Sequence, residues 1–160
     1  MTPHPALSPL AFLLGTWRGQ GEGEYPTIEP FQYTEELVFG HAGKPFLAYR
    51  QATRRIGGDE GPLHAEVGYV RPVGDAAAEL VLAQPTGVVE VHQGVIDDTA
   101  VTFRSSVVAT TPTAKAVSEV ERWFRRGGDE LHYRLAMAAV GQPLTHHLEG
   151  RLRRIDDPNL

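Results

Sequence analysis

A chain of 160 residues is long enough for one domain that buries a core and a ligand, and we predict a single domain over residues 1–160. Its composition, 41% hydrophobic and 22% charged residues, is typical of ordinary globular proteins. The net charge of −5 argues against a nucleic-acid partner, which needs a concentrated basic surface, and the absence of cysteine excludes disulfides and thiolate metal sites.

The N-terminal segment predicts a cap on the fold and not a membrane anchor. Residues 5–14 are expected to form one or two helical turns that cover one end of the molecule. The apolar run from Leu10 to Leu14 is far shorter than a membrane span, and no lysine or arginine precedes it. A chain without cysteine also suits a reducing compartment. We therefore expect a cytoplasmic protein with no membrane contact.

The remaining chain consists of short segments in which apolar and polar residues alternate, as in antiparallel strands. Turn residues at 57–61, 74–75, 85–87, 97–98 and 127–129 join these segments so closely that consecutive strands must be neighbours. We predict an all-β fold, an antiparallel up-and-down barrel of about ten strands. More than about eight strands leave an interior that side chains do not fill, hence a cavity. The predicted strands are Trp17–Glu24, Phe31–Phe39, Phe46–Ile56, Leu63–Arg71, Glu79–Ala83, Val88–Gly94, Ala100–Val108, Val117–Arg125, Glu130–Ala138 and Leu144–Arg153.

The first strand carries an unusual set of glycines. Gly15, Gly19, Gly21 and Gly23 lie on the same strand face as Trp17. Glycine within a strand marks a bend or a place where another group comes close, so we expect something to pack tightly against this face. Trp17 is predicted to be structural.

Histidines supply the available chemistry. His64 shares a strand face with Glu66, and His92 shares one with Glu90, which is typical of paired surface residues. His132 is expected to face solvent.

His146 and His147 are adjacent in a predicted strand, so one of them must point into the barrel. Strict alternation favours His146, because it shares its face with Leu144 and Leu148. Pro143 disturbs the start of this strand, and a one-residue bulge would turn His147 inward instead.

The glycine segment has the pattern GxWxGxG through Gly15, Trp17, Gly19 and Gly21, and it resembles the signature of the nitrobindins, haem-binding β-barrels also called peroxynitrite isomerases. Further blocks in family order extend the resemblance over roughly Leu10 to Arg154. It implies a barrel similar to lipocalins and fatty-acid-binding proteins. The blocks are Tyr25–Ile28, Phe39–Pro45, Leu63–Glu66 with Gly68-Tyr69, Pro112–Lys115 and Met137–Leu148.

The resemblance also implies a site. The family's axial ligand is the histidine immediately before a leucine in the last strand, which corresponds to His147, with His146 as the fallback. Thr27 and Lys115 are the further residues expected to contact the haem. The cofactor would be ferric haem b, one per chain, and the activity conversion of peroxynitrite to nitrate, with nitric oxide as a further ligand. The family pattern implies no distal histidine and an apolar distal wall, for which the candidates are Phe46, Leu47, Leu82, Val88, Val89, Met137 and Val140.

Two other functions remain open. The same barrel could be a non-enzymatic carrier of a fatty acid or another apolar molecule, with Arg50, Arg122 or Arg134 inside the cavity. A hydrolase using a non-haem metal at His146 and His147 is less favoured, because adjacent strand histidines diverge. A homodimer is compatible with either function.

Overall fold

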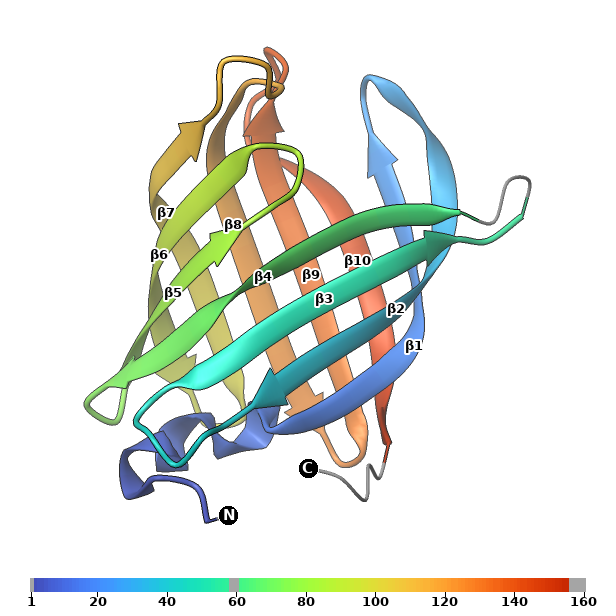
Figure 1. The fold of residues 1–160 in the computed structure, drawn as a ribbon. Helices are drawn as coiled ribbons and strands as arrows, with labels where there is room; N and C mark the ends of the chain where they lie inside the picture. Colours follow the sequence, from blue (N-terminus) through green and yellow to red (C-terminus); the bar gives the residue numbers. More distant parts are fainter. Residues whose placement is uncertain (1, 58–60, 156–160) are drawn as a thin grey trace.

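The computed structural model describes residues 2–57 and 61–155, and within these residues ten strands form one closed antiparallel barrel (Figure 1). The order around the barrel is β1-β10-β9-β8-β7-β6-β5-β4-β3-β2, so each strand pairs with its neighbours in sequence and β1 closes on β10. This confirms the predicted up-and-down barrel. The strands are β1 (Gly15–Tyr25), β2 (Ile28–Gly40), β3 (Leu47–Arg55), β4 (Pro62–Val73), β5 (Ala77–Ala83), β6 (Val88–Asp97), β7 (Ala100–Thr110), β8 (Val117–Gly127), β9 (Glu130–Ala139) and β10 (Thr145–Ile155).

The predicted strand ends differ from the observed ends by no more than three residues. Four of the five predicted turns lie between strands as expected. The fifth, at 57–61, includes residues 58–60, which lie outside the described part of the chain.

The N-terminal segment is a 3-10 helix, η1 (Pro5–Leu13), at the lower end of the barrel in Figure 1. Leu7, Leu10 and Leu13 are at most 1% exposed, so they close this end of the barrel. The indole Nε1 of Trp17 donates to the carbonyl of Leu13 at 2.8 Å and fixes the helix to β1. The predicted cap is therefore present.

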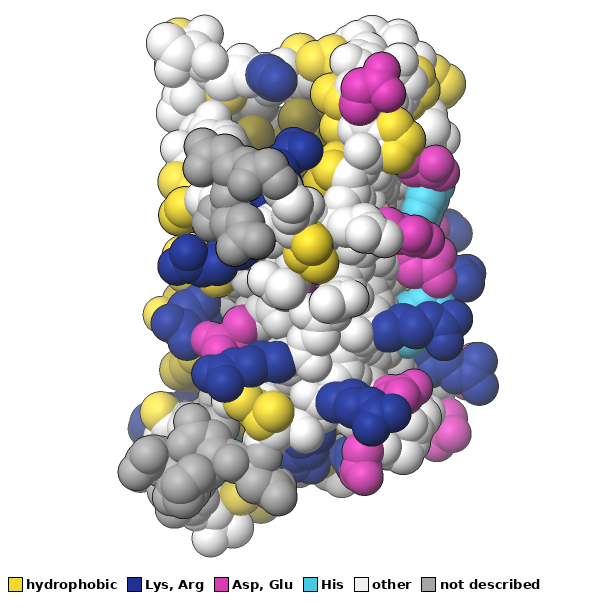
Figure 2. Space-filling model, turned by 90° about the vertical axis from the view of Figure 1, so that its right-hand side faces the viewer, with side chains coloured by type: hydrophobic (Ala, Val, Ile, Leu, Met, Phe, Trp, Pro, Cys, Tyr) yellow, Lys and Arg dark blue, Asp and Glu magenta, His cyan; other side chains and the backbone are white. Residues whose placement is uncertain are grey.

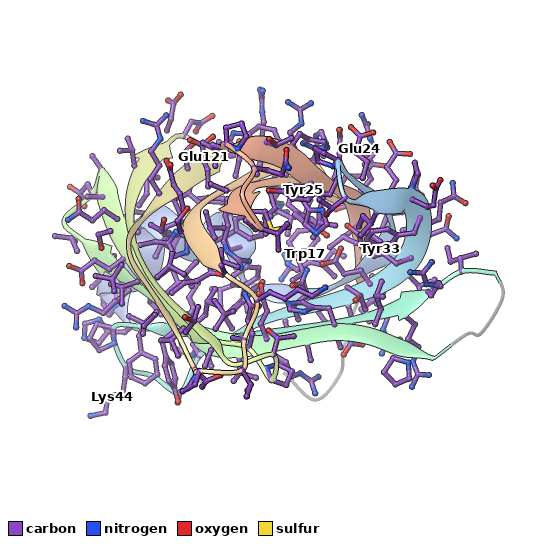
Figure 3. The ribbon with its side chains drawn as sticks, turned by 90° about the horizontal axis from the view of Figure 1, so that it is seen from above. Trp17, Glu24, Tyr25, Tyr33, Lys44 and Glu121 are labelled. Carbon is purple, nitrogen blue, oxygen red and sulfur yellow. The ribbon has the colours of Figure 1, made fainter. Side chains whose placement is uncertain are left out.

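Aromatic side chains fill the lower half of the barrel. Phe39 and Phe124 pack edge to face with ring centroids 5.8 Å apart, and Phe124 stacks on Tyr133 at 6.0 Å. Seen from above in Figure 3, Trp17 and Tyr33 lie within the ring of strands, whereas Lys44 lies outside it. Because the lower half is packed, the open volume lies at the upper end.

The glycines of β1 allow close packing on the inner face, as the sequence predicts. A Cβ atom on Gly21 would lie 2.4 Å from the Tyr33 ring, and one on Gly23 would lie 2.3 Å from the Phe31 ring. At Gly19 the obstacle is the carbonyl oxygen of Arg151 in the next strand, at 2.1 Å. The glycines thus let β2 place two aromatic rings against β1.

Candidate functional site

A cavity of about 560 Å³ occupies the upper half of the barrel, which is the size range of small-molecule and cofactor sites. Its mouth lies among the β1–β2, β5–β6 and β7–β8 connections. The walls are mainly apolar, and the floor is polar. The apolar lining residues are Ile28, Phe31, Leu63, Val88, Ala114, Val117, Val120, Leu135, Met137 and Leu148, and the polar ones include Gln51, Thr53, His64, Glu66, Gln84, Glu90 and Arg122.

The predicted apolar wall is only partly correct. Val88 and Met137 line the cavity, whereas Leu47 and Leu82 are buried in the packed core instead. Val89 and Val140 are about two-fifths exposed on the outside. Alternation assigns a residue to the inner face but does not give its height along the barrel axis, which decides whether it meets the cavity. The remaining candidate, Phe46, packs against the ring of Tyr69, which is 55% exposed on the outer surface.

His147 reaches the cavity through a bulge in β10. His146 pairs with Ala136 of β9, and Leu148 pairs with Leu135, the residue directly before Ala136. His147 therefore has no partner of its own in β9 and is the inserted residue of the bulge. A bulge places two consecutive side chains on one side of a sheet. His147 and Leu148 accordingly both line the cavity.

His146 lies outside the cavity, in a groove that it shares with Glu149. Strict alternation, which would turn His146 inward, is therefore wrong at this point, and the bulge is the reason. The structure thus gives His147 and His146 different surroundings.

The His147 ring is held in one orientation. Its Nδ1 lies 3.0 Å from the backbone carbonyl oxygen of Glu24, so the neutral ring donates from Nδ1 and keeps a lone pair on Nε2. The Tyr25 ring packs against it edge to face at 5.3 Å. Burial lowers the pKa of His147, and the Glu24 carbonyl opposes this only in part. The imidazole is therefore a neutral nitrogen donor, which is the form that binds a metal.

Tyr25 braces the strand ends behind this histidine. Its hydroxyl accepts a hydrogen bond from the amide of Ala139 at 3.0 Å and donates to the Met137 carbonyl at 3.1 Å. These contacts connect the end of β1 to β9 across the position of the bulge.

Lys115 and Thr27 differ in their positions. Lys115 is exposed and lines the mouth of the cavity, together with Arg55. Thr27 is exposed in the tight turn between β1 and β2, and the neighbouring Ile28 lines the cavity in its place. Lys115 can therefore meet an anionic group at the mouth, whereas the described contacts do not bring Thr27 into the cavity.

The floor of the cavity is a buried ion cluster centred on Arg122 of β8. Its guanidinium donates to Glu66 of β4 at 2.6 and 2.9 Å and to Glu90 of β6 at 3.0 and 3.1 Å. Burial would raise the pKa of Glu66, but Arg122 and, to a smaller extent, His64 outweigh it and lower that pKa to about 2. The same guanidinium lowers the pKa of Glu90 against the effect of burial. Both carboxylates are therefore ionised.

Four more side chains contact these carboxylates. The Tyr49 hydroxyl donates to Glu66 at 2.5 Å, and His64 Nε2 lies 3.4 Å from the other oxygen of Glu66. His92 and Gln84 contact Glu90 at 2.7 and 2.6 Å. The predicted His–Glu pairs are thus present, but their prediction as surface pairs is wrong: Glu66, Glu90 and His92 are at most 1% exposed. Arg122, which pairs with these carboxylates, lies 32 residues from Glu90 and 56 from Glu66 in the chain. The local sequence pattern therefore gives no indication of the pairing.

The structure does not support the interior arginines considered for a carrier. Of the three arginines considered for a carrier, Arg50 and Arg134 are exposed, and Arg122 already donates four hydrogen bonds to two carboxylates. A fatty-acid carboxylate would meet no unpaired cation there. Among residues 2–57 and 61–155, no three His, Asp or Glu side chains are grouped to hold a metal ion. His132 contacts Glu149 at 2.7 Å, as expected outside the cavity.

The fold and the site together define a class: a closed ligand-binding β-barrel with one neutral histidine nitrogen presented inside its cavity. The comparisons specify the family. Residues 6–154 match the family described as "THAP4-like, heme-binding beta-barrel domain", and the chain belongs to this family. The resemblance to nitrobindins is confirmed. The lone-pair nitrogen of His147 and the apolar walls fit a haem.

Named relatives match nearly the whole chain. "Peroxynitrite isomerase 2" of Mycobacterium marinum is 56% identical over 155 residues, which cover 94% of this chain and 96% of the relative. "Peroxynitrite isomerase" of Nocardia farcinica is 50% identical over 155 residues, covering 94% and 92%. The crystal structure of Rv2717c from M. tuberculosis has a TM-score of 0.89 at 46% identity, covering 97% of this chain and 100% of that one. None of the described helices is long and apolar enough to cross a membrane.

Proposed function

We propose that this chain is a ferric haem b protein, with one haem per barrel, that isomerises peroxynitrite to nitrate. The observation that carries the proposal is the position of His147, whose Nδ1 is engaged by Glu24 while Nε2 remains available inside the cavity. The haem-binding family and the relatives named peroxynitrite isomerase support the same function. Nitric oxide is proposed as a second ligand of the same site.

The chain contributes a donor, walls and a charged mouth. His147 would be the axial ligand, held by the Glu24 carbonyl in the tautomer that presents Nε2. Lys115 would pair with a haem propionate at the mouth, where it is already exposed. When bound, the ferric haem would supply the iron chemistry that converts peroxynitrite to nitrate. The apolar walls would exclude bulk water from that site.

Thr27 and His146 are less well placed than Lys115 and His147 to contact the haem. Thr27 reaches a propionate only if the haem extends beyond the mouth, because its turn is exposed. His146 is the fallback ligand, and it would have to leave its outer groove to bind iron.

The test is an absorption titration with ferric haem, applied to the wild type, His147→Ala and His146→Ala. We expect a stoichiometric Soret band in the wild type and in His146→Ala. In His147→Ala we expect haem affinity to fall at least about a hundredfold, more than the loss of a second-shell partner costs. Stopped-flow mixing with peroxynitrite should then show faster nitrate formation only with the two proteins that load haem, the wild type and His146→Ala.

Other outcomes contradict parts of the proposal. Loss of the Soret band only in His146→Ala would make His146 the ligand. A wild type that binds a fluorescent fatty acid but no haem would favour the carrier. His147→Gly supplied with free imidazole provides a matched control, because restored haem binding would show that the missing nitrogen, and not a folding defect, caused the loss.

We also propose a cytoplasmic location and a homodimer. A chain without cysteine is suited to a reducing compartment. The dimer is supported by the exposed apolar side chains on the outer surface of β4 to β7, among them Val67, Tyr69 and Val107.

A further inference from the structure

His64 is the polar group that links the cavity to the buried ion cluster. Its side chain is 28% exposed, whereas those of Glu66 and Arg122 behind it are at most 4% exposed. The ring lines the same cavity as His147. A small molecule in the cavity can therefore meet the His64 ring without disturbing the cluster.

The two histidines lie on opposite walls. His64 belongs to β4 and His147 to β10. Around the ten-stranded barrel, β4 is four strands from β10 in one direction and six in the other, which is close to diametrically opposite. A ligand held by His147 therefore presents its far side towards the wall that carries His64, so the expectation of a distal wall without histidine is wrong.

The ion cluster orients His64 through a contact of 3.4 Å between its Nε2 and the Glu66 carboxylate. Glu66 accepts two hydrogen bonds from Arg122 and one from Tyr49, so its carboxylate cannot turn to follow a moving imidazole. An ionised carboxylate only accepts hydrogen bonds, so the contact at Nε2 requires an N–H there. The neutral ring then has its lone pair on Nδ1.

This tautomer makes His64 a poor iron ligand and a good hydrogen-bond acceptor. Nε2, the ring nitrogen farther from the backbone and less crowded, is engaged by Glu66. The remaining Nδ1 sits next to the ring carbon that carries the backbone, where a flat macrocycle cannot approach closely. His147 has the opposite arrangement, with Nδ1 engaged and Nε2 available.

We propose that His64, positioned by Glu66, is the proton-accepting residue for acidic small molecules that bind at the open side of the haem. This rests on the proposed haem site at His147. Peroxynitrous acid, the conjugate acid of the substrate, is one such molecule. Its O–H proton passes to Nδ1 as the anion forms, and the resulting imidazolium is offset by the adjacent Glu66 carboxylate.

Cyanide tests this proposal independently of isomerase activity. Hydrogen cyanide is undissociated near neutral pH and must lose its proton when the anion binds ferric iron. We expect the association rate of cyanide with the haem-loaded protein to fall roughly a hundredfold in His64→Leu, the lower end of what a positioned base contributes. His64→Gln, whose amide oxygen accepts a hydrogen bond but not a proton, should also be slow.

A matched control separates this role from a structural one. His132→Leu makes the same chemical change on the outer face of the barrel. It should bind cyanide at the wild-type rate. All variants should retain the wild-type haem affinity, because His64 is not the axial ligand.

A second measurement needs no haem. Nitrogen NMR of the apoprotein should show His64 protonated at Nε2 and unprotonated at Nδ1. The opposite tautomer, or an unchanged cyanide rate in a His64→Leu protein that loads haem normally, would overturn the proposal for His64 alone. A wild type that shows no Soret band would instead overturn the proposed haem function, on which the role of His64 depends. A six-coordinate wild type that becomes five-coordinate in His64→Leu would show that His64 is an iron ligand instead.

Discussion

Glu35 shows how burial alone can change the charge of a residue in this barrel. The side chain is 4% exposed; Gln51 donates to Oε1, and Oε2 has no hydrogen-bond partner. Burial raises the pKa of Glu35 to about 8, and the nearby Gln51 and Tyr133 side chains offset this only partly. The carboxyl is therefore neutral at neutral pH, in contrast to the ionised Glu66 beside Arg122.

This raised pKa predicts a pH dependence of stability. Below the unfolded pKa both states carry the proton, so Glu35 has no effect. Between about 4.5 and 8 the unfolded chain releases the proton and the folded chain keeps it, so the free energy of unfolding falls as pH rises. The free energy of unfolding falls by at most about 5 kcal/mol in total over this pH range.

Glu35→Gln isolates this effect, because the amide keeps an acceptor for Gln51 and cannot ionise. We expect the variant and the wild type to have similar unfolding free energies at pH 5, and the variant to be more stable by several kcal/mol at pH 8. Urea unfolding at both pH values measures the difference. Curves that stay parallel from pH 5 to 8 would show that Glu35 titrates normally.

At the scale of the strand, β1 depends on glycines that the neighbouring strands approach. A Cβ on Gly19 would lie 2.1 Å from the backbone carbonyl oxygen of Arg151, which cannot rotate away. Gly40, at the end of β2, has no atom within 4 Å of the same position.

We therefore expect Gly19→Ala to destabilise the barrel by at least about 2 kcal/mol, as overpacking does. Gly40→Ala should be neutral or stabilising by up to about 1 kcal/mol, because alanine restricts the unfolded chain. Thermal or urea unfolding of both variants provides the comparison. Equal stability of the two would mean that β10 can shift to accommodate the methyl group.

The strands also show what sequence patterns can and cannot predict. Alternation and turn residues located all ten strands, because both depend on residues within a few positions of one another. The bulge at His147 depends on how β10 pairs with β9, and Pro143 is only a weak local sign of it. The family resemblance, and not the residue pattern, favoured His147.

The polar floor of the cavity was missed for a similar reason. Glu66 and Glu90 look like surface residues when only their own strands are considered. Their burial becomes favourable only because Arg122 arrives between them from β8. Three distant strands must be placed before that pairing can be recognised.

At the scale of the whole molecule, the outer surface has two different sides. Charged side chains of both signs gather on the side shown in Figure 2. Elsewhere on the outer surface, Glu36 forms exposed ion pairs with Arg18 and Arg50. The outer side of β4 to β7 instead carries two rows of uncharged residues, which we name the apolar face. These rows are Tyr69, Val81, Val91 and Val107, and Val67, Ala83, Val89 and Ala109, each row paired across neighbouring strands.

We propose that a second copy of the chain covers the apolar face. Val67, Tyr69 and Val107 are more than half exposed, and a contiguous exposed apolar patch of this kind usually marks an interface. Beside it, Arg71 and Glu79 form an exposed ion pair at 2.8 Å.

Val81→Lys, in the middle of the apolar face, therefore tests the dimer. Light scattering after gel filtration should give the wild type twice the 17.5 kDa mass of one chain and give Val81→Lys a single chain, because a buried lysine without a partner is costly. Gln20→Lys, on the exposed outer face of β1, should remain dimeric. Haem affinity should be the same in all three proteins, since the cavity opens at the end of the barrel and not through this face. A wild type of single-chain mass would exclude the dimer and leave the interior site unaffected.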